Sequence, residues 1–564
     1  VAMNGTVRFS GATNGLAFPS GTVEYYTATP TVAVVADGVY YDLLFSGTGT
    51  YTIGSNIEVA NILTVNSGAL KVLDSFSVSV DDAVIVSPLA TFTLENNASL
   101  VQTGYTGPNT GEINVIRNTT PIVLDDYTYW SSPTTGTQTL HDFSPNTYSG
   151  RFYNYNNSWG SLNETTTVFE PGIGYAIQAS QGTSSTIPSV DTSYQFVGVP
   201  NNGTTVVPLV VRTSDNKGHR LLGNPYPSAI DADDFINANL EYTGTINQTI
   251  TGTLYFWTHN HATSGYDYLA TDYATYNLFG SVGVASGTGN LTDPSQYIAS
   301  GQGFFVQNKF AGNVTFDNTM RIIENNTNFY RQNKVNSDEE RSRIWLKLAK
   351  NAVDVTGTLV GYGPNSTNEY DSGYDSFVYD KNQSFSIYSF IGTNKMAIQS
   401  KVLPFVDTDT FPIGYSINSA GNATISIEKV DGFFLYDQPV YLEDKVLNVV
   451  HDIVNSPYIF STAAGTFNDR FVLRYTDKTL GTDDFESIEK SVLISKNKSE
   501  LRIKSADENI KNIAVYDLLG RKVFEKSAVN NTEFSTSDFV LRNQIVVVKV
   551  TLENGKTVSQ KVVW

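Results

Sequence analysis

Histidine and acidic side chains are the residues of this 564-residue chain that are suited to metal chemistry. The chain has five histidines and no cysteine, which excludes thiol catalysis, zinc–thiolate sites and disulfide bonds. Only His259 and His261 have the spacing of metal ligands, because residues two apart on a strand lie on the same face. The sequence places no third ligand beside them, so a solvated pair in a loop is the favoured interpretation.

Two short acidic segments have the composition of calcium-binding loops. They run from Asp231 to Asp234 and from Asp371 to Asp375, and Ca²⁺ prefers carboxylate and carbonyl oxygens. Neither segment matches an EF-hand or a nonapeptide calcium repeat. We therefore predict no cofactor; Ca²⁺ stays open as an alternative, more at the second segment than at the first.

Motifs for catalysis are missing from the sequence. It contains no Gly-x-Ser-x-Gly elbow, no P-loop and no strand-coupled Gly-x-Gly-x-x-Gly. Paired carboxylates for glycoside hydrolysis depend on a spatial separation that a sequence does not reveal. A solenoid start with many aromatic residues resembles pectin-lyase-like enzymes, but residues 1–300 contain only seven Lys and Arg. We predict that the protein is not an enzyme.

Aromatic side chains form another candidate site. Tyr153, Tyr155, Trp159, Trp257 and the segment from Tyr266 to Tyr276 lie where loops are expected. Exposed Tyr and Trp rings on such loops are suited to stacking against sugars. The favoured alternative is that most of these rings belong to the β core or to cross-strand pairs.

The composition favours strands over helices. Only 16% of residues are charged and 12% are aromatic, with 33 Tyr and 31 Phe. The net charge of −19 argues against a nucleic-acid partner, because phosphate binding requires clustered Lys and Arg. The length exceeds what one core supports, so several domains are expected.

Charge divides the chain into two unequal parts. Residues 1–488 carry 23 Lys and Arg against 46 Asp and Glu, a net charge of −23. Residues 489–564 carry 13 against 9, a net charge of +4. A basic terminal module on an acidic passenger suits a detachable address label, and drift in surface charge is the alternative.

Residues 1–103 read as the end of a parallel β-solenoid. The segment from Leu63 to Val72 aligns with that from Val84 to Leu94 at an offset of 21 to 22 residues, the period of a short β coil. An ordinary β-meander is the alternative. Only three or four coils can be counted, so we expect the polypeptide to continue upstream, although a removed signal peptide would also explain the N-terminus.

Residues 104–335 contain a degenerate duplication. In each copy a Pro-containing turn leads to an Asp-Phe segment, an aromatic strand and then a Gly-x-Gly turn into a second aromatic strand. The glycine turns are Gly172–Gly174 in the first copy and Gly301–Gly303 in the second. We predict one or two β-sandwich units built from two pseudo-symmetric halves.

Two further β units complete the passenger and the terminus. Strand alternation from about 341 to 476 predicts a third β unit, and 477–487 reads as a polar linker. The closing segment of this unit, from Gly465 to Phe471, resembles the end of a jelly-roll-like β-sandwich. In residues 488–564 a glycine turn follows the strand at Ile513, and Asn554–Gly555 is a strong hairpin signal. The last segment is therefore predicted to be a small Ig-like β-sandwich.

This last segment resembles the type A C-terminal sorting domain of proteins exported by the type IX secretion system of Bacteroidota. The resemblance rests on the run from Val515 to Lys522, the Val-rich strand from Ile545 to Val550 and the Gly555–Lys556 turn. The family's usual Pro-Asn-Pro is absent near the module start, and the chain ends in Trp564 rather than a basic residue. The residues matched to the sorting signal are Tyr516, Asp517, Leu518, Gly520, Arg521, Lys522, Val548, Lys549, Gly555 and Lys556.

The resemblance implies a secreted or cell-surface protein that crosses the periplasm and the outer membrane. As the family implies, the folded passenger passes through a translocon barrel, and residues 488–564 are handed to an outer-membrane shuttle barrel. We predict an adhesin-like protein, of the gliding-motility type, whose passenger contacts glycans or surfaces. The alternatives are a lectin-like carbohydrate-binding module and, less favoured, a polysaccharide-degrading enzyme.

Overall fold

The computed structural model confirms the all-β class and the parallel β-solenoid. Among the described residues, helical structure is confined to α1 (Leu140–Phe143), α2 (Ala232–Asn239) and the short 3-10 helices η2 (Asn318–Met320) and η3 (Gly432–Leu435). The structure describes residues 6–9, 18–189, 192–214, 217–240, 249–259, 272–283, 293–326, 341–351, 354–379, 383–435, 438–477, 492–497, 500–506, 508–517, 521–538, 545–553 and 557–563.

The chain divides into two compact units, Val1–Asp477 and Lys478–Trp564. Each unit has hydrophobic cores of its own. The division falls at the start of the segment predicted to be a linker, of which residue 477 is described and 478–487 lie outside the described residues. The two units are treated separately below.

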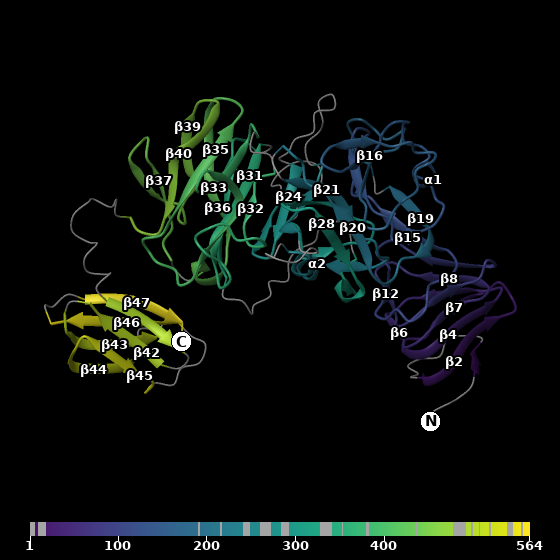
Figure 1. Ribbon diagram of the computed structural model, residues 1–564, viewed down its shortest axis with the longest axis horizontal. Coiled ribbons are helices and arrows are strands. Elements are labelled where there is room, and N and C mark those ends of the chain that lie inside the picture. The colour runs from purple at the N-terminus through teal and green to yellow at the C-terminus, as the bar shows by residue number, and fades with distance from the viewer. Residues whose placement is uncertain are drawn as a thin grey trace. The chain divides into compact units, whose positions relative to one another are not determined.

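The larger unit begins with stacked parallel strands, drawn in purple and blue in Figure 1. One sheet contains β1 (Thr6–Phe9), β2 (Phe18–Thr27), β4 (Val39–Gly47), β6 (Ile57–Val59), β9 (Ser77–Val80) and β12 (Ser99–Gln102), with β7 (Leu63–Val65) and β10 (Val84–Val86) beside them. The second contains β3 (Val32–Val34), β5 (Thr50–Ile53), β8 (Gly68–Val72), β11 (Ala90–Leu94), β13 (Ile113–Asn118), β19 (Ser193–Pro200) and β15 (Thr134–Thr135).

The register of these strands matches the period in the sequence. Val84 pairs with Leu63, and Ala90 pairs with Gly68, so successive coils are offset by 21 and 22 residues. Inward-facing Val and Leu side chains of neighbouring coils are buried on one another. Each coil therefore buries its apolar face against the next, which is the constraint that produces a repeat of this length.

The solenoid is continuous with the residues that follow it. One hydrophobic core includes residues from Val23 to Met320, and the second sheet changes from parallel to antiparallel where β13 pairs with β19. The buried Arg321 guanidinium donates to the Leu100 carbonyl at 2.7 Å and lies over the Tyr226 ring. The Asn326 amide donates to the Ala98 carbonyl at 2.7 Å. Later residues thus satisfy backbone groups at the last coil.

The duplicated segments form two sheets with the same strand order. In the first copy β14 (Tyr127–Trp130), β18 (Tyr175–Gln178) and β16 (Phe152–Tyr155) lie side by side, followed by β17 (Trp159–Ser161). In the second copy the order is β21 (Gly218–Gly223), β27 (Gly303–Asn308) and β23 (Ile250–Trp257), followed by β24 (Tyr273–Asn277) and β25 (Gly280–Val282). Around them lie β20 (Thr205–Leu209), β22 (Ala229–Asp231), β26 (Tyr297–Ile298), β28 (Gly312–Phe316) and β29 (Arg321–Ile322).

The two copies exchange equivalent hydrogen bonds. Gly172 and Gly301 have φ values of 77° and 78°, a conformation that glycine adopts without steric cost. The Ser131 N–H donates to the Gly301 carbonyl at 2.9 Å, and the Gly223 N–H donates to the Gly172 carbonyl at 3.1 Å. This exchange is reciprocal, so the two halves are related by a local pseudo-twofold arrangement.

A third group of strands completes the larger unit, drawn in green in Figure 1. The eleven described strands, in the order β38-β37-β40-β35-β33-β34-β31-β30-β36-β39 with β32 beside β34, form one sheet around a separate core. They are β30 (Ser342–Ala349), β31 (Val355–Gly363), β32 (Ser376–Phe377), β33 (Ser386–Ile391), β34 (Asn394–Val402), β35 (Thr410–Ile417), β36 (Gly421–Val430), β37 (Tyr441–Asp444), β38 (Val449–Asp452), β39 (Tyr458–Thr462) and β40 (Gly465–Arg474). The Trp345 indole N–H donates to the Ser281 carbonyl at 2.8 Å and so links this group to the second copy.

The terminal unit is built from two antiparallel sheets that share a core of Val, Ile and Leu. Its three-stranded sheet contains β41 (Val492–Asn497), β42 (Glu500–Ser505) and β45 (Glu533–Thr536). Its four-stranded sheet contains, in order, β44 (Lys522–Asn531), β43 (Ile510–Asp517), β46 (Ile545–Leu552) and β47 (Thr557–Val563). The edges of the larger sheet are therefore β44 and β47.

The reciprocal exchange leads to a prediction for Gly223→Ala. A Cβ at residue 223 would lie 2.2 Å from the Cβ of Ser131, so the two copies have to separate locally. We expect the free energy of unfolding to fall by about 3 kcal/mol or more, measured by urea denaturation. Gly150→Ala is the control, because a Cβ there meets nothing within 4 Å and only the positive φ is penalised, at about 1 kcal/mol. Equal losses in the two variants would contradict the prediction.

Candidate functional site

Four of the ten predicted sorting residues, Tyr516, Asp517, Arg521 and Lys522, are described at the hairpin of β43 and β44. The Asp517 carboxylate is buried and accepts two bonds from Arg521, from the backbone N–H at 2.9 Å and from Nε at 2.7 Å. The Asp517 N–H in turn donates to the Arg521 carbonyl at 3.0 Å. Asp517 therefore closes the turn between β43 and β44, while 74% of the Arg521 side chain remains exposed.

The other matched residues divide between core and surface. Val548 is fully buried, whereas Lys522 and Lys549 are exposed and Tyr516 is half-buried. The matched residues Leu518, Gly520, Gly555 and Lys556 lie outside the described residues.

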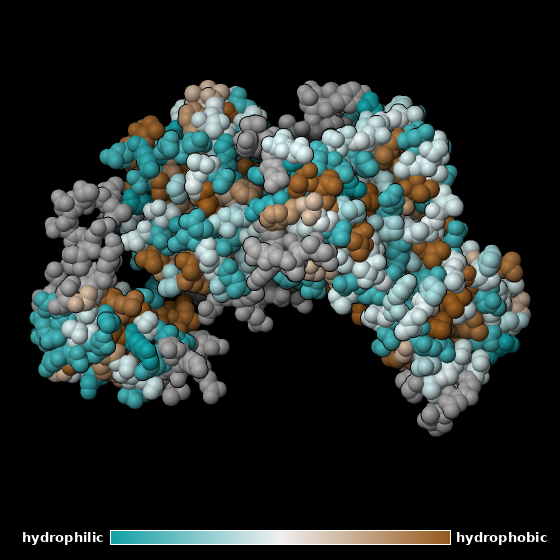
Figure 2. Space-filling model, viewed as in Figure 1, coloured by the Kyte–Doolittle hydropathy of each residue, from teal (hydrophilic) through white to brown (hydrophobic). Residues whose placement is uncertain are grey.

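Three lysines, which we name the basic row, lie on the outer face of the four-stranded sheet: Lys522, whose ammonium group pairs with the Glu525 carboxylate at 2.8 Å, Lys549 and Lys561. Tyr516 pairs with Lys522 on one side and with Val547 on the other, and Val547 pairs with Lys561. Lys549 lies on the same face, two residues along β46 from Val547. The sequence comparison missed Lys561, although alternation along β47 places it on this face. Figure 2 shows that hydrophilic residues make up most of the described surface visible on this unit.

Asp517→Ala should loosen the β43–β44 hairpin. The change removes the acceptor for the backbone N–H and for Nε of Arg521, at a cost of about 1–3 kcal/mol. Amides of β43 and β44 should then exchange hydrogen for deuterium faster than in the wild-type chain. Arg521→Ala is the matched control, because it leaves the backbone bond to Asp517 in place. Unchanged exchange in Asp517→Ala would show that the carboxylate does not hold the turn.

The aromatic residues singled out in the sequence come together between the two copies. Tyr129, from the first copy, stacks on Trp257 of the second at a centroid distance of 5.9 Å, and its hydroxyl lies 2.7 Å from that of Tyr273. Phe305, from the second copy, meets Tyr155 at 5.0 Å and Trp159 at 5.9 Å. We name this set the aromatic layer; it comprises Tyr127, Tyr129, Tyr153, Tyr155, Trp159, Tyr255, Trp257, Tyr273, Phe305 and Tyr379.

Most of the aromatic layer is a core and not a surface. Tyr129 and Phe305 are buried, and Tyr276 belongs to the main core of the larger unit. Trp159 is the exception, with 47% of its surface exposed. Tyr266 and Tyr268 lie outside the described residues. Both sequence interpretations therefore apply, core pairing to most of the rings and surface display to Trp159.

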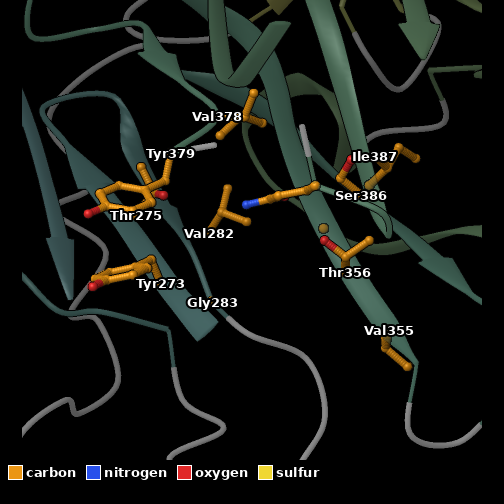
Figure 3. Close-up of a pocket in the computed structure, with 13 residues that line it drawn as sticks. Tyr273, Thr275, Val282, Gly283, Val355, Thr356, Val378, Tyr379, Ser386 and Ile387 are labelled. Atoms are coloured by element: carbon orange, nitrogen blue, oxygen red, sulfur yellow. The ribbon is translucent and has the colours of Figure 1, made fainter. Parts of the chain in front are cut away.

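A small cleft lies beside the aromatic layer, as Figure 3 shows. Tyr273 and Thr275 of the second copy face Thr356 and Ser386 of the third group across it. Its volume of 40 Å³ has room for a few waters and is too small for a sugar ring.

His259 lies in a buried polar cluster rather than in a solvated loop. Its Nε2 is 2.9 Å from the Thr120 hydroxyl and its Nδ1 is 3.5 Å from the Asp126 carboxylate, while His261 lies outside the described residues. Burial lowers the pKa of His259 to about 4 and raises the pKa of Asp126 to about 7. At a pH between about 4 and 7, the His259 imidazole and the Asp126 carboxyl are therefore both neutral.

The buried imidazole predicts an acid-sensitive stability term. His259 stays neutral in the folded chain down to a pH of about 4, whereas in the unfolded chain histidine takes up a proton below about 6.5. Its contribution is present above pH 6.5 and is lost as the pH falls, by at most about 1.4 kcal/mol per pH unit. Asp126 has the opposite effect in this range, because the folded chain keeps a proton that the unfolded chain releases.

His259→Asn isolates this term, because Asn does not titrate and tolerates the positive φ of 41° at this position. The stability advantage of the wild type over the variant should shrink as the pH falls from 6.5 to 4.5, measured by denaturation at each pH. Parallel pH profiles for the two proteins would contradict the lowered pKa.

The two acidic segments that have the composition of calcium loops are used by the fold itself. Asp231 caps helix α2, where its carboxylate accepts from the backbone N–H groups of Asp233 and Asp234. The Asp375 carboxylate is fully buried and accepts from the backbone N–H groups of Ser400 and Asp371, at 2.7 and 2.8 Å. Burial raises the pKa of Asp375 to about 7. Among the described residues, no three His, Asp or Glu side chains are grouped closely enough to hold a metal ion.

Comparison with known families places the chain but does not assign it an activity. The chain belongs to the family described as "Domain of unknown function (DUF8693)", whose model matches residues 45–475. A second family, "Domain of unknown function (DUF8694)", matches residues 480–564. The two matches meet where the structure divides into its two units. The curated proteins contain no significant match, and no helix among the described residues is long and apolar enough to span a membrane.

Proposed function

We propose that this protein is an adhesin-like cell-surface protein exported by a type IX secretion system, with residues 488–564 as its sorting signal. The observation that carries the proposal is the separateness of the terminal unit. It has its own core, its own two sheets and a net charge opposite to that of the passenger. A module of this kind can be recognised, and removed, without disturbing what it is attached to.

The terminal unit offers two features that a membrane partner can bind. Among the described strands of the four-stranded sheet, β44 and β47 lie at the edges, where strand addition can occur. The basic row of Lys522, Lys549 and Lys561 adds positive charge on the outer face of the same sheet. The partner in the proposal is an outer-membrane shuttle barrel that receives the module after the translocon barrel.

The larger unit suits an adhesive passenger. It is almost wholly β, it carries the excess of acidic residues, and its described part holds no grouped metal ligands. Such a unit presents extended surfaces through which an adhesive protein can contact its target. The passenger would act after export, on the outside of the cell.

Deletion of residues 488–564 should leave the passenger folded but retained inside the cell. The larger unit keeps both of its main cores in this truncation, so its protease resistance should match that of the full chain. Cell fractionation with immunoblotting measures the location. Secretion of the truncated chain at the wild-type level would refute the sorting role.

A milder variant tests the basic row within an intact module. Lys549→Glu combined with Lys561→Glu changes exposed side chains and should lower export while the melting temperature stays the same. Lys445→Glu is the matched control, because it reverses an exposed charge on the passenger. Equal export of the wild type, the double variant and the control would exclude the basic row as part of the signal.

A further inference from the structure

The hairpin of β16 and β17 displays Trp159 at the rim of the aromatic layer. Tyr155 pairs directly with Trp159 across the hairpin, and Tyr153 pairs with Ser161, so these side chains lie on one face. The Trp159 ring contacts Tyr155 at 5.1 Å and Phe305 at 5.9 Å, both edge to face. Although it packs on these rings, 47% of the Trp159 surface remains open to solvent.

The hairpin is held in place by the second copy. Asn157 forms the turn with a φ of 65°, and its side chain accepts from the His219 N–H at 2.8 Å and donates to the Val210 carbonyl at 3.2 Å. The Asn157 N–H donates to the His219 carbonyl at 2.9 Å. A turn tied at three points cannot swing freely, so the indole is presented in one orientation before any ligand arrives. Preorganisation of this kind reduces the entropy lost on binding.

The exposed side chains of the hairpin beside Trp159 are polar and uncharged, and the nearest cation that acts on its partner ring Tyr155 is Arg212. Asn156, Ser158, Ser161 and Asn163 are exposed on the same hairpin and its continuation. Amide and hydroxyl groups both donate and accept hydrogen bonds, as the hydroxyl groups of a sugar do. An exposed aromatic ring bordered by such groups matches the two sides of a pyranose, with an apolar C–H face and a polar rim.

We propose that Trp159 and the polar residues of its hairpin form a binding site for neutral oligosaccharides. The indole stacks on the C–H face of one sugar ring, and the amides and hydroxyls contact the hydroxyl groups around it. In this arrangement the glycan lies along the exposed surface of the hairpin as an extended chain. This inference rests on the adhesive part of the proposed function and is independent of export.

The test is affinity gel electrophoresis of the purified full-length chain. The gels contain neutral polysaccharides (xyloglucan, mannan, laminarin or cellulose derivatives) or acidic ones (alginate or polygalacturonate). We expect retardation by at least one neutral polysaccharide. Trp159→Ala should weaken this binding by about tenfold or more. Trp159→Phe should retain part of the binding because an aromatic face remains.

Two further variants separate loss of binding from loss of fold. Ser161→Glu places a charge beside the indole at an exposed position, so it should weaken binding while melting stays native. Phe310→Ala removes another exposed aromatic ring, with 57% of its surface open, and should bind as the wild type does. Melting temperatures of all variants are measured in parallel.

Three results would overturn the proposal. In the first, no neutral polysaccharide retards the wild-type chain. In the second, only the acidic polysaccharides retard it. In the third, the Trp159→Ala and Ser161→Glu variants both bind like the wild type. Binding of a protein partner through Trp159, without any glycan binding, falls under the first result. None of these results affects the location of the chain in cells, so export is tested separately.

Discussion

The larger unit depends on the reciprocal hydrogen bonds between its two duplicated halves. In each half a glycine carbonyl accepts a hydrogen bond from a backbone N–H of the other half. Ser131 donates to Gly301, and Gly223 donates to Gly172. This exchange brings the two aromatic sheet faces together and forms the aromatic layer. The same closeness ties the turn of β16 and β17 to the second copy, which leaves Trp159 exposed on a fixed support. The candidate binding surface is thus a consequence of the duplication.

The end of the solenoid is the second constraint. A parallel coil leaves backbone groups unpaired at its last turn, and without cysteine the chain has no disulfide to stabilise that end. Arg321 and Asn326 supply donors to carbonyl groups at residues 100 and 98, more than 200 positions earlier. The solenoid and the duplicated sheets therefore share a core and are one body within the unit.

Local patterns carried the predictions that the structure confirms. The offset of 21 to 22 residues reappears as strand register because each coil repeats the same burial. The roles of Asp231 and Asp375 could not be predicted, since an acidic loop has the same composition whether it binds a cation or caps backbone N–H groups. The meeting of Tyr129 with Trp257 and Phe305 also needed the structure, because it joins residues far apart in the chain. Arg321 carried no local signal of its burial.

The proposed function assigns export to the terminal unit and the passenger role to the larger unit, and the family matches divide the chain where these two units meet. The most direct test of this proposal asks whether the terminal unit alone is sufficient for export. Residues 478–564 are fused to an unrelated folded reporter with a periplasmic signal peptide, in a bacterium that carries a type IX secretion system. The account predicts that the reporter reaches the cell surface or the medium, and that the reporter without the module stays in the periplasm. A fused reporter that remains in the periplasm with its module folded would contradict the account.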